Sequence, residues 1–561
     1  MTGRVCLVGL AVACYSSGRP MARQDYRDLT KEQLIELLKA RDRKKFGLVW
    51  ERDAIEHDTA LNDDFVVLDA VPELNAGAGP HENLIIEGDN FDALRALRVA
   101  YAGQVKCIYI DPPYNTGNRD FVYNDRFVDK DHAWRHSMWL EFMFQRLTLA
   151  KDLLAQDGAI FVSIDDNEIF HLGMLMNEVF GEGSMVANCI WQKRYSRENR
   201  ECIGDAHEYL LAYSPDPAGF KIRRNKVPLT EKQAAVYKNP NKDIKGRWRT
   251  IPMTAQGFRP NQMYEIESTA GVIHTPPEGR CWAMIEPEYL KLKRVGKIYF
   301  GSKGESQPSV IRYLSEVEGV VPWTWWPHEE VGHTDEAAKE IRSIFGTQTA
   351  FSTPKPVRLI DRILQIATNP GDIVLDFFAG SGTTGHAVLK MNAANPDQAP
   401  RKFILVSSTE ATAEEPAKNL CRDVCRQRVA NVIAGYGDTP GTGGGFAYLQ
   451  TRRLPMNRVV RKIEHAQVWL LLQLMHFGGI SEEAALASGR LYRRGPATRR
   501  VFYLTALTEA VFQRLENEMA GCGEVTIYTW QPEALATRID SARTSILPIP
   551  QTLVERFGPR L

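Results

Sequence analysis

The stretch Ile108-Tyr109-Ile110-Asp111-Pro112-Pro113-Tyr114-Asn115 contains the strongest indication of the fold in this 561-residue sequence. An apolar run passes directly into an acid, two prolines and an aromatic residue. Such a run is typical of a buried strand, and in an open parallel sheet ligands bind beyond the carboxyl ends of the strands. The pattern therefore predicts a functional turn at the end of a strand. The alternative is an ordinary Pro-Pro turn with an exposed tyrosine.

The residue types in this turn suit chemistry on an amino group attached to an aromatic base. The lone pair of such an amine is delocalised into the ring, so the amine is a poor nucleophile until acceptors hold its N–H bonds. The Asp111 carboxylate and the Pro112 carbonyl can be those acceptors. Pro113 fixes the bend through its locked φ, and Tyr114 offers a ring on which a base can stack. We expect these four residues to be catalytic.

A second motif, Asp376-Phe377-Phe378-Ala379-Gly380-Ser381-Gly382-Thr383-Thr384-Gly385, also follows an apolar run. Closely spaced glycines let the backbone approach a ligand and open a helix at its N-terminus. The motif is not a GxxxxGK[ST] phosphate loop, because no lysine follows the last glycine. Its glycines do match GxGxxG, so taken alone this loop is also compatible with a nicotinamide or flavin enzyme, or with a simple tight turn.

Short apolar runs alternate with helical patterns over two separate parts of the chain, which predicts an α/β fold with a parallel sheet covered by helices. Between them, residues 195–350 are richer in Pro, Gly, aromatic and basic residues. The expected order is a leader with a helical segment (1–80), one half of the core (81–194), an inserted domain (195–350), the other half (351–437) and a C-terminal domain (438–561). The apolar helix at 466–475 is either the core of that last domain or a contact surface for a partner.

Composition sets limits on the other possibilities. The net charge is zero, so a nucleic-acid surface has to be a local patch. The nine cysteines form no paired CxxC motifs and no histidine cluster joins them, so we expect free thiols in the cytoplasm and no metal site. Residues 1–20 resemble a short signal peptide, but the expectation is an unstructured leader, with Met21 as a second plausible start. No other segment is a membrane candidate.

Together the two motifs resemble the β class of amino-methyltransferases, which methylate the N6 amine of adenine in DNA. Asp111 to Tyr114 match the family's DPPY motif and Phe378 to Gly382 match its FxGxG motif. The catalytic motif comes first, in the circularly permuted order of that class. The resemblance implies a Rossmann-like fold with S-adenosyl-L-methionine as cofactor. It also implies cofactor-binding roles for Asp89, Lys355, Asp376, Phe378, Gly380, Gly382, Thr383 and Glu410, although Glu410 stands beyond the usual position of the ribose-binding acid.

The stretch from Asp111 to Phe127 and the sequence Val331-Gly332-His333-Thr334 narrow the resemblance to the modification subunit of Type III restriction–modification systems. In that family the insertion recognises DNA. Residues 191–260 hold fifteen Lys or Arg against seven Asp or Glu, so a surface for double-stranded DNA is expected there. The candidate DNA-binding residues are Lys193, Arg194, Arg197, Arg247 and Arg249.

The same resemblance implies a homodimer and a restriction subunit with helicase and nuclease functions. Asp165-Asp166-Asn167-Glu168 is either part of the target pocket or a solvated acidic loop. Three alternatives stay open: an orphan DNA adenine methyltransferase, a catalytically silent DNA-recognition subunit, and an enzyme that acts on RNA or on the cytosine amine.

Overall fold

The computed structural model describes residues 64–117, 122–123, 126–127, 135–196, 202–346, 351–412, 415–481, 485–487, 489–539 and 543–557. The leader, the helix expected near residue 30 and Arg197 lie outside these ranges. Among the residues that are described, no helix is both long and apolar enough to cross a membrane.

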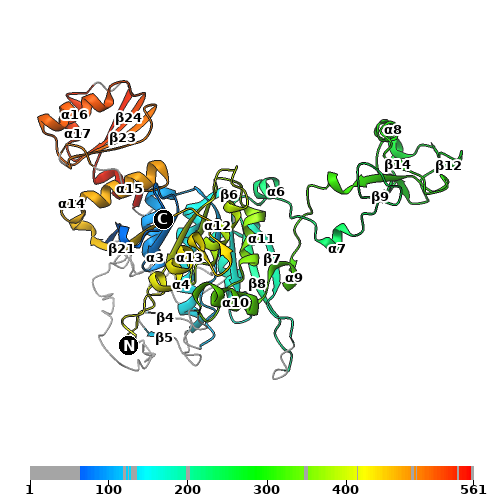
Figure 1. The fold of residues 1–561 in the computed structure, drawn as a ribbon, viewed down its shortest axis with the longest axis horizontal. Helices are drawn as coiled ribbons and strands as arrows, with labels where there is room; N and C mark the ends of the chain where they lie inside the picture. Colours follow the sequence, from blue (N-terminus) through cyan, green and yellow to red (C-terminus); the bar gives the residue numbers. More distant parts are fainter. Residues whose placement is uncertain are drawn as a thin grey trace, which may run out of the picture. The chain divides into compact units, whose positions relative to one another are not determined.

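A ten-stranded sheet is the centre of the fold (Figure 1). Its order is β1 (Asp64–Ala70), β21 (Ala447–Pro455), β2 (Leu84–Glu87), β18 (Lys402–Ser407), β17 (Ile373–Asp376), β3 (Val105–Ile110), β6 (Leu154–Ile164), β8 (His207–Tyr213), β7 (Met185–Gln192) and β16 (Trp325–Trp326). The five strands from β2 to β6 run parallel, whereas β8 is antiparallel to both of its neighbours. The α/β fold with permuted motif order is therefore confirmed.

The chain changes its direction of travel across the sheet between β17 and β3. From β17 it passes through α12 (Thr383–Ala393) to β18 on one side, and from β3 through α4 (Arg135–Leu153) to β6 on the other. Ligands of open α/β sheets bind at such a switch point, outside the carboxyl ends of the strands. Both predicted motifs follow the two strands that meet there.

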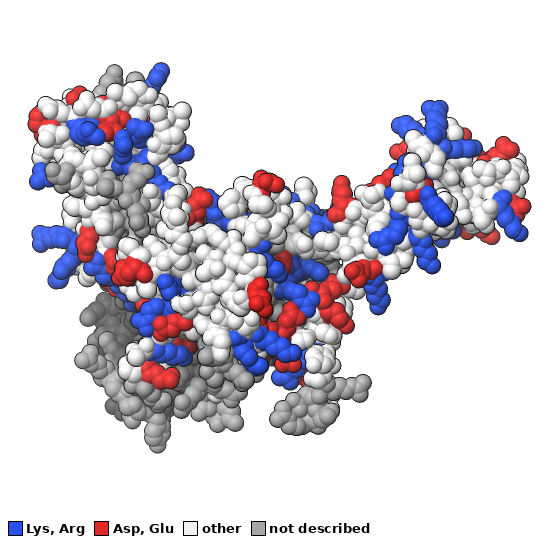
Figure 2. Space-filling model, viewed as in Figure 1, with Lys and Arg blue, Asp and Glu red and all other residues white. Residues whose placement is uncertain are grey.

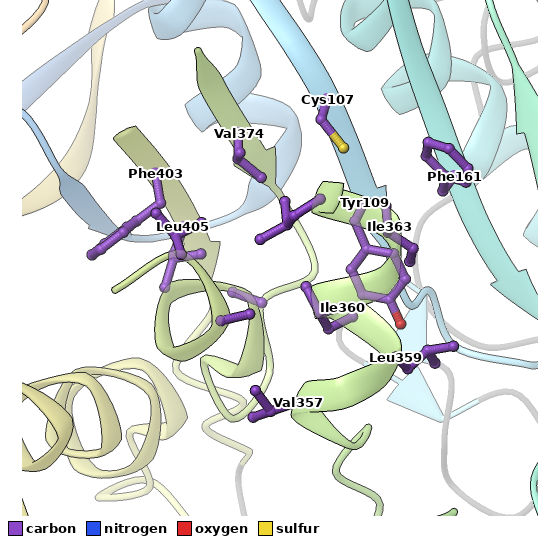
Figure 3. Packing of buried hydrophobic residues seen from close by; sticks show 14 of the residues in the cluster. Cys107, Tyr109, Phe161, Val357, Leu359, Ile360, Ile363, Val374, Phe403 and Leu405 are labelled. Carbon is purple, nitrogen blue, oxygen red and sulfur yellow. The ribbon is translucent and has the colours of Figure 1, made fainter. Parts of the chain in front are cut away.

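Both faces of the sheet are covered. Tyr109 of β3 lies beside Ile360 and Ile363 of α11 (Val357–Ala367) in a buried cluster to which Cys107 and Val357 also belong (Figure 3). Ile108 and Ile110 point to the opposite face and are also fully buried. The helices α3 (Asn90–Tyr101), α4 and α5 (Ile169–Phe180) contact one another as one group, and α11, α12 and α13 (Gln427–Ala434) as another. This arrangement explains why the core strands read as continuous apolar runs.

The sheet takes strands from beyond the two core segments expected from sequence. β8 and β16 come from within residues 195–350, while β1 and β21 come from the expected N- and C-terminal parts. β8 joins the sheet because Leu210 and Ala212 fill the same apolar cluster as Phe161 of β6. The inserted segment proper thus begins after Tyr213.

The inserted segment has small sheets and a core of its own. Its elements are α6 (Pro217–Arg223), α7 (Glu231–Ala234), β9 (Trp248–Pro252), β10 (Thr254–Gln256), β11 (Ile266–Glu267), β12 (Ile273–His274), β13 (Arg280–Trp282), α8 (Glu286–Arg294), β14 (Ile298–Tyr299) and β15 (Ser309–Tyr313). Met253, Ile266 and Trp282 are buried in its centre with Tyr289 and Phe300. After β16, α9 (His328–Val331) and α10 (Thr334–Phe345) lead back towards α11.

The C-terminal region contains a second small α/β unit. Its sheet has the order β22 (Leu491–Arg494), β23 (Arg499–Leu504), β24 (Glu524–Thr529) and β25 (Thr544–Pro548), accompanied by α16 (Glu509–Met519), α17 (Pro532–Ala536) and α18 (Gln551–Phe557). The remaining short elements are the pairs β4 (Val122–Tyr123) with β5 (Arg126–Phe127) and β19 (Gly435–Tyr436) with β20 (Thr439–Pro440), and the helix α14 (Val459–Lys462).

The apolar helix expected at 466–475 is α15 (His465–Phe477). It contacts α3 and β1, and its residues Val468, Leu471 and Leu472 are completely buried. The helix is therefore part of the packing around the large sheet. These apolar residues are therefore not a free contact surface. On another side, α15 contacts the small C-terminal sheet through His465 with Tyr503 and His476 with Tyr528.

Candidate active site

The two predicted motifs meet at one edge of the central sheet. β3 and β17 are adjacent and parallel, with Ile108 paired to Leu375. Asp111 follows the end of β3, and Asp376 is the last residue of β17. Their carboxylates therefore leave the sheet from neighbouring strands at the same end, as the position of the motifs in the sequence predicts.

Asp111 binds the side chain of Lys355. The Lys355 ammonium donates to both carboxylate oxygens of Asp111 at 2.7 Å. Burial alone would lower the pKa of Lys355, but the carboxylates of Asp111 and Glu208 outweigh it and hold the pKa above its ordinary value. Lys355 is predicted to bind the cofactor, and the structure places its ammonium on the Asp111 carboxylate.

The backbone of Lys355 also links the two motifs. Its carbonyl accepts a hydrogen bond from Thr383 Oγ1 at 3.4 Å, in the glycine loop, while its side chain reaches Asp111. Only 9% of Lys355 is exposed. A single residue on the segment before α11 thus contacts both loops of the site.

Tyr114 is held by its hydroxyl group. The hydroxyl oxygen lies 2.9 Å from both Asp111 Oδ1 and Glu208 Oε2, and its single proton is shared between these two acceptors. Its ring lies 5.0 Å from the Lys355 ammonium, measured to the ring centroid. The Pro113 carbonyl accepts from Trp139 Nε1 at 2.7 Å, which ties the turn to α4 and leaves this carbonyl engaged. The ring orientation and the bend of the turn are therefore both fixed.

Glu208 is a site residue that sequence reasoning missed. It lies on β8, is 8% exposed, and approaches Lys355 at 3.6 Å as well as bonding Tyr114. Lys193, expected at a DNA surface, pairs instead with Glu208 at 3.5 Å and with Asp205 at 2.8 Å, and only 11% of its side chain is exposed. Because the placement of β8 depends on a distant part of the sheet, no local pattern in the sequence marks Glu208.

The glycine loop is built around the Asp376 carboxylate. Thr384 Oγ1 donates to it at 2.5 Å and the Phe378 backbone N–H at 3.1 Å. Burial raises the pKa of Asp376 to about 7, against the opposing effect of these two hydrogen bonds. Asp376, Phe378, Gly380, Gly382 and Thr383 all belong to this single loop and the start of α12, so the structure brings these five candidates together.

Two glycines of the loop have conformations that favour glycine. Gly380 has φ +49° and Gly382 φ +78°. A Cβ atom on Gly380 would lie 3.1 Å from the ring of Phe351, and one on Gly382 would lie 3.0 Å from the Cys425 carbonyl. The loop therefore depends on glycine both for its backbone angles and for space.

A polar cavity of about 360 Å³ opens at the ends of β2 and β18 and beside β21. It is lined by Glu87, Gly88, Asp89, Ser408, Thr409, Gln450 and Thr451. Asp89 caps α3 by accepting from the Phe91 N–H at 2.9 Å, and it pairs with Arg146 at 3.0 Å. Glu410, a third acid predicted to bind cofactor besides Asp89 and Asp376, forms an ion pair with Lys418 at 3.0 Å. Ser408 and Thr409, to which the sequence analysis assigned no role, line the cavity.

The acidic stretch after β6 divides into two parts. Asp165 binds the backbone N–H of Asn167 at 2.9 Å, and Asp166 accepts from the Tyr209 hydroxyl at 2.9 Å. Glu168 is completely buried and accepts from Asn115 Nδ2 at 2.5 Å, next to Tyr114. Burial raises the pKa of Glu168 to about 7. Glu168 is therefore not part of a solvated loop.

The basic candidates of the inserted segment are exposed on β9 and beside it. Arg247 and Arg249 are exposed, and Arg249 lies 5.1 Å from the centroid of the Tyr237 ring. Arg249 is also paired directly across the strands with Arg312 of β15. Figure 2 shows Lys and Arg side chains around this part of the chain. Arg194 is 44% exposed near Asp205.

Comparison with known proteins agrees with this geometry. The Type III restriction-modification enzyme StyLTI Mod subunit of Salmonella typhimurium strain LT2 is 35% identical over 401 residues, 66% of this chain and 60% of its own length. The EcoPI Mod subunit of Escherichia phage P1 is 32% identical, over 59% of this chain and 58% of its own length. The Type II methyltransferase M.KpnI of Klebsiella pneumoniae is 31% identical, over 57% and 79% respectively.

This chain thus spans about three fifths of the length of the Type III subunits that it matches. The N6/N4 DNA methylase family matches residues 105–412, which include the turn Asp111–Tyr114, the inserted segment and the glycine loop. Since the match covers more than half of the sequence, this protein belongs to the DNA methylase family.

Proposed function

We propose that this protein transfers a methyl group from S-adenosyl-L-methionine to the N6 amine of adenine in double-stranded DNA, as the modification subunit of a Type III restriction–modification system. The observation that carries the proposal is the meeting of Asp111–Tyr114 and Asp376–Thr383 at adjacent strand ends, joined by Lys355. Three of the most similar curated relatives are named as Type III Mod subunits. We propose that the protein acts in the cytoplasm, where its DNA substrate would be.

The residues present suit this cofactor. It carries positive charge, which the buried carboxylate of Asp376 can face, and the positive φ of Gly380 and Gly382 lets the loop backbone approach a ligand closely. Its ribose hydroxyls and adenine need polar partners, which Asp89, Ser408 and Thr409 offer in the neighbouring cavity. When bound, S-adenosyl-L-methionine supplies an electrophilic methyl group.

The catalytic turn supplies acceptors and a stacking surface for the target base. Asp111 and the Pro112 carbonyl would accept hydrogen bonds from the two N–H groups of the amine. The neighbouring Pro113 carbonyl is not available for this role, because it already accepts from Trp139. Tyr114 would stack on the flipped base, with its ring fixed by the hydroxyl bonds to Asp111 and Glu208. Burial raises the pKa of the Asp111 carboxyl, and the Lys355 ammonium bound to it opposes that rise. The Asp111 carboxylate can receive the proton that the amine loses.

The inserted segment is the proposed DNA-recognition domain. Like charges directly opposite on paired strands destabilise a sheet, so the juxtaposition of Arg249 and Arg312 is best compensated by an anion between them. A DNA phosphate is such an anion. Arg247, which is exposed beside them, extends the same basic surface.

We further infer a homodimer and a separate restriction subunit. The 561 residues contain no GxxxxGK[ST] loop, and the helicase and nuclease functions are those of the proposed restriction subunit. Without such a subunit encoded beside it, the protein would be an orphan methyltransferase with the same site.

Labelled-methyl transfer tests the proposed function. Purified protein and methyl-labelled S-adenosyl-L-methionine are incubated with double-stranded DNA, single-stranded DNA or RNA, and methylome sequencing of a host that expresses the protein identifies the modified sequence. We expect label in double-stranded DNA and one methylated adenine motif. Label in RNA alone would refute the DNA assignment, and no label in any substrate would support a silent recognition subunit.

A further inference from the structure

A cluster of three potential metal ligands lies next to the catalytic turn. Nδ1 of His136 is 2.6 Å from Oε1 of Glu168, and Nδ1 of His171 is 2.8 Å from Oε2 of the same carboxylate. One ligand atom from each of the three residues can be chosen so that the three atoms all lie within 4.8 Å of one another. One ion with ligand bonds of about 2.0–2.2 Å can bridge donors at this spacing after small side-chain rotations.

The three side chains come from well-defined helix starts. His136 is the second residue of α4, Glu168 immediately precedes α5, and His171 lies on the first turn of α5. Glu168 and His171 are three residues apart, a spacing that puts both on the same side of a helix. Because α4 and α5 pack against each other, His136 and His171 are held close together, and Glu168 lies in the turn directly before α5.

Both carboxylate oxygens of Glu168 face an imidazole nitrogen. His136 Nδ1 lies 2.6 Å from Oε1, and His171 Nδ1 lies 2.8 Å from Oε2. Glu168 is 0% exposed. Burying a carboxylate is costly unless an opposite charge compensates it. A cation shared by this carboxylate and the two imidazoles would supply that charge.

We propose that His136, Glu168 and His171 bind one divalent transition-metal ion of the zinc class. Two imidazole nitrogens and one carboxylate suit zinc, nickel or cobalt, whereas magnesium and calcium prefer oxygen donors alone. Asn115 donates to Glu168 Oε1 at 2.5 Å, which is the second layer of support that carboxylate ligands receive in metal sites. The histidine side chains are 40% and 39% exposed, so an ion can enter from solvent.

The site would stabilise the catalytic turn without supplying a reacting group. Asn115 follows Tyr114 directly, has φ +57° and is fully buried, so the ion would fix Asn115 through Glu168. The sequence gives no sign of this site, since His136 and His171 are far apart along the chain and no cysteine takes part. Metal binding here does not depend on the proposed methyl transfer, and the two can be tested separately.

Calorimetric titration of the chelator-treated, full-length protein tests the proposal. With Zn²⁺ we expect one ion per chain and a dissociation constant in the micromolar range or below, and with Co²⁺ visible absorption that reports nitrogen and oxygen ligands. Glu168→Gln and His171→Ala should each weaken Zn²⁺ binding at least tenfold, while His274→Ala, a partly buried histidine of the inserted segment, should not.

Two outcomes would overturn the site: no stoichiometric Zn²⁺ binding by the wild type, or unchanged affinity in the two ligand variants. Thermal unfolding checks that each variant is folded. If Glu168→Gln does not fold, His171→Ala decides the matter alone, because its ring is partly exposed and its removal leaves the Asn115–Glu168 bond in place.

Discussion

At the scale of single residues, the site depends on how four charged or polar side chains share protons and partners. Lys355 is bound by Asp111 and approached by Glu208, and Tyr114 bonds both carboxylates. Removing one member of a buried ion pair leaves an uncompensated charge and costs about 3–5 kcal/mol. Because Glu208 stays beside Lys355 when Asp111 is neutralised, the fold should tolerate a change at Asp111 better than this figure suggests.

Asp111→Asn should lower the rate of methyl transfer by about a hundredfold or more, since removing one preformed transition-state interaction has an effect of that size. Affinity for S-adenosyl-L-methionine should change by no more than a few-fold. Single-turnover kinetics and calorimetry measure the two quantities. Asp166→Asn is the matched control, because this carboxylate at the same sheet edge bonds Tyr209 instead. Near-normal turnover of Asp111→Asn would remove Asp111 from the mechanism.

Cofactor affinity should rise as pH rises through about 7, the pKa to which burial raises Asp376. The folded chain holds this carboxyl protonated below that pH, and a cationic ligand favours the ionised form. By the same linkage, the free energy of unfolding should fall as pH rises from the ordinary pKa of 3.8 to about 7, because the folded chain binds the proton more tightly. Asp376→Asn should flatten the pH dependence of affinity measured by calorimetry. An unchanged profile would show that Asp376 does not face the charge of the cofactor.

At the scale of elements, the sequence predicts where the core strands and loops lie along the chain, but it does not predict which strands are neighbours in the sheet. The apolar runs before Asp111 and Asp376 predict β3 and β17 correctly, because strands covered on both faces are apolar throughout. β8 has a similar run but stands in a segment rich in Pro, Gly and Arg, so composition assigns it to the insertion. Its place beside β6, and hence that of Glu208, is decided by contacts that sequence spacing does not encode.

Gly380→Leu should abolish cofactor binding, because a side chain at φ +49° would meet the Phe351 ring and fill the approach to the loop. Gly371→Ala is the matched control. Gly371 also has positive φ, at +86°, and lies just before β17, but the nearest atom to its added Cβ is 3.7 Å away. Both changes should lower the free energy of unfolding by roughly 1–2 kcal/mol, because a residue other than glycine is strained at positive φ. Equal cofactor affinity of the two variants by calorimetry would mean that the glycine loop is only a turn.

Neutralising Arg249 and Arg312 together should weaken DNA binding and make it less dependent on salt, with the slope reduced by about 1 for each phosphate that the protein no longer neutralises. Fluorescence anisotropy over a series of salt concentrations measures the slope. Arg461→Ala, an exposed residue of α14, serves as the control. Should affinity fall only for the preferred sequence, the pair reads bases and not phosphates. If neither the affinity for DNA nor its salt dependence changes, the recognition surface lies elsewhere on the protein.

At the scale of the whole molecule, composition proved a weak guide to surfaces. The excess of basic residues at 191–260 predicts a positive patch, and Arg249 conforms to it, but Lys193 is nearly buried between Asp205 and Glu208. A count of charges does not show which of them pair. Likewise α15 is apolar enough to suggest a partner, yet its apolar residues pack on α3 and β1. Any dimer contact therefore has to use other residues.

Light scattering at micromolar concentration should show a dimer, with or without DNA, if the protein assembles as proposed. The buried apolar residues of α15 predict in addition that Val468→Asp unfolds the protein instead of merely separating the subunits, since a buried unpaired charge is very costly. A strict monomer under both conditions would contradict the dimer. A folded, monomeric Val468→Asp variant would contradict the packing described for α15.

The most direct test of the central claim is the identity of the methylated nucleoside together with its dependence on the catalytic turn. DNA treated with the protein and S-adenosyl-L-methionine is digested to nucleosides and analysed by mass spectrometry, with wild type and Asp111→Asn compared at equal cofactor saturation. The meeting of the two loops at β3 and β17 predicts N6-methyladenine from the wild type and at least about a hundredfold less from the variant. N4-methylcytosine as the product, or N6-methyladenine formed equally fast by both proteins, would contradict it.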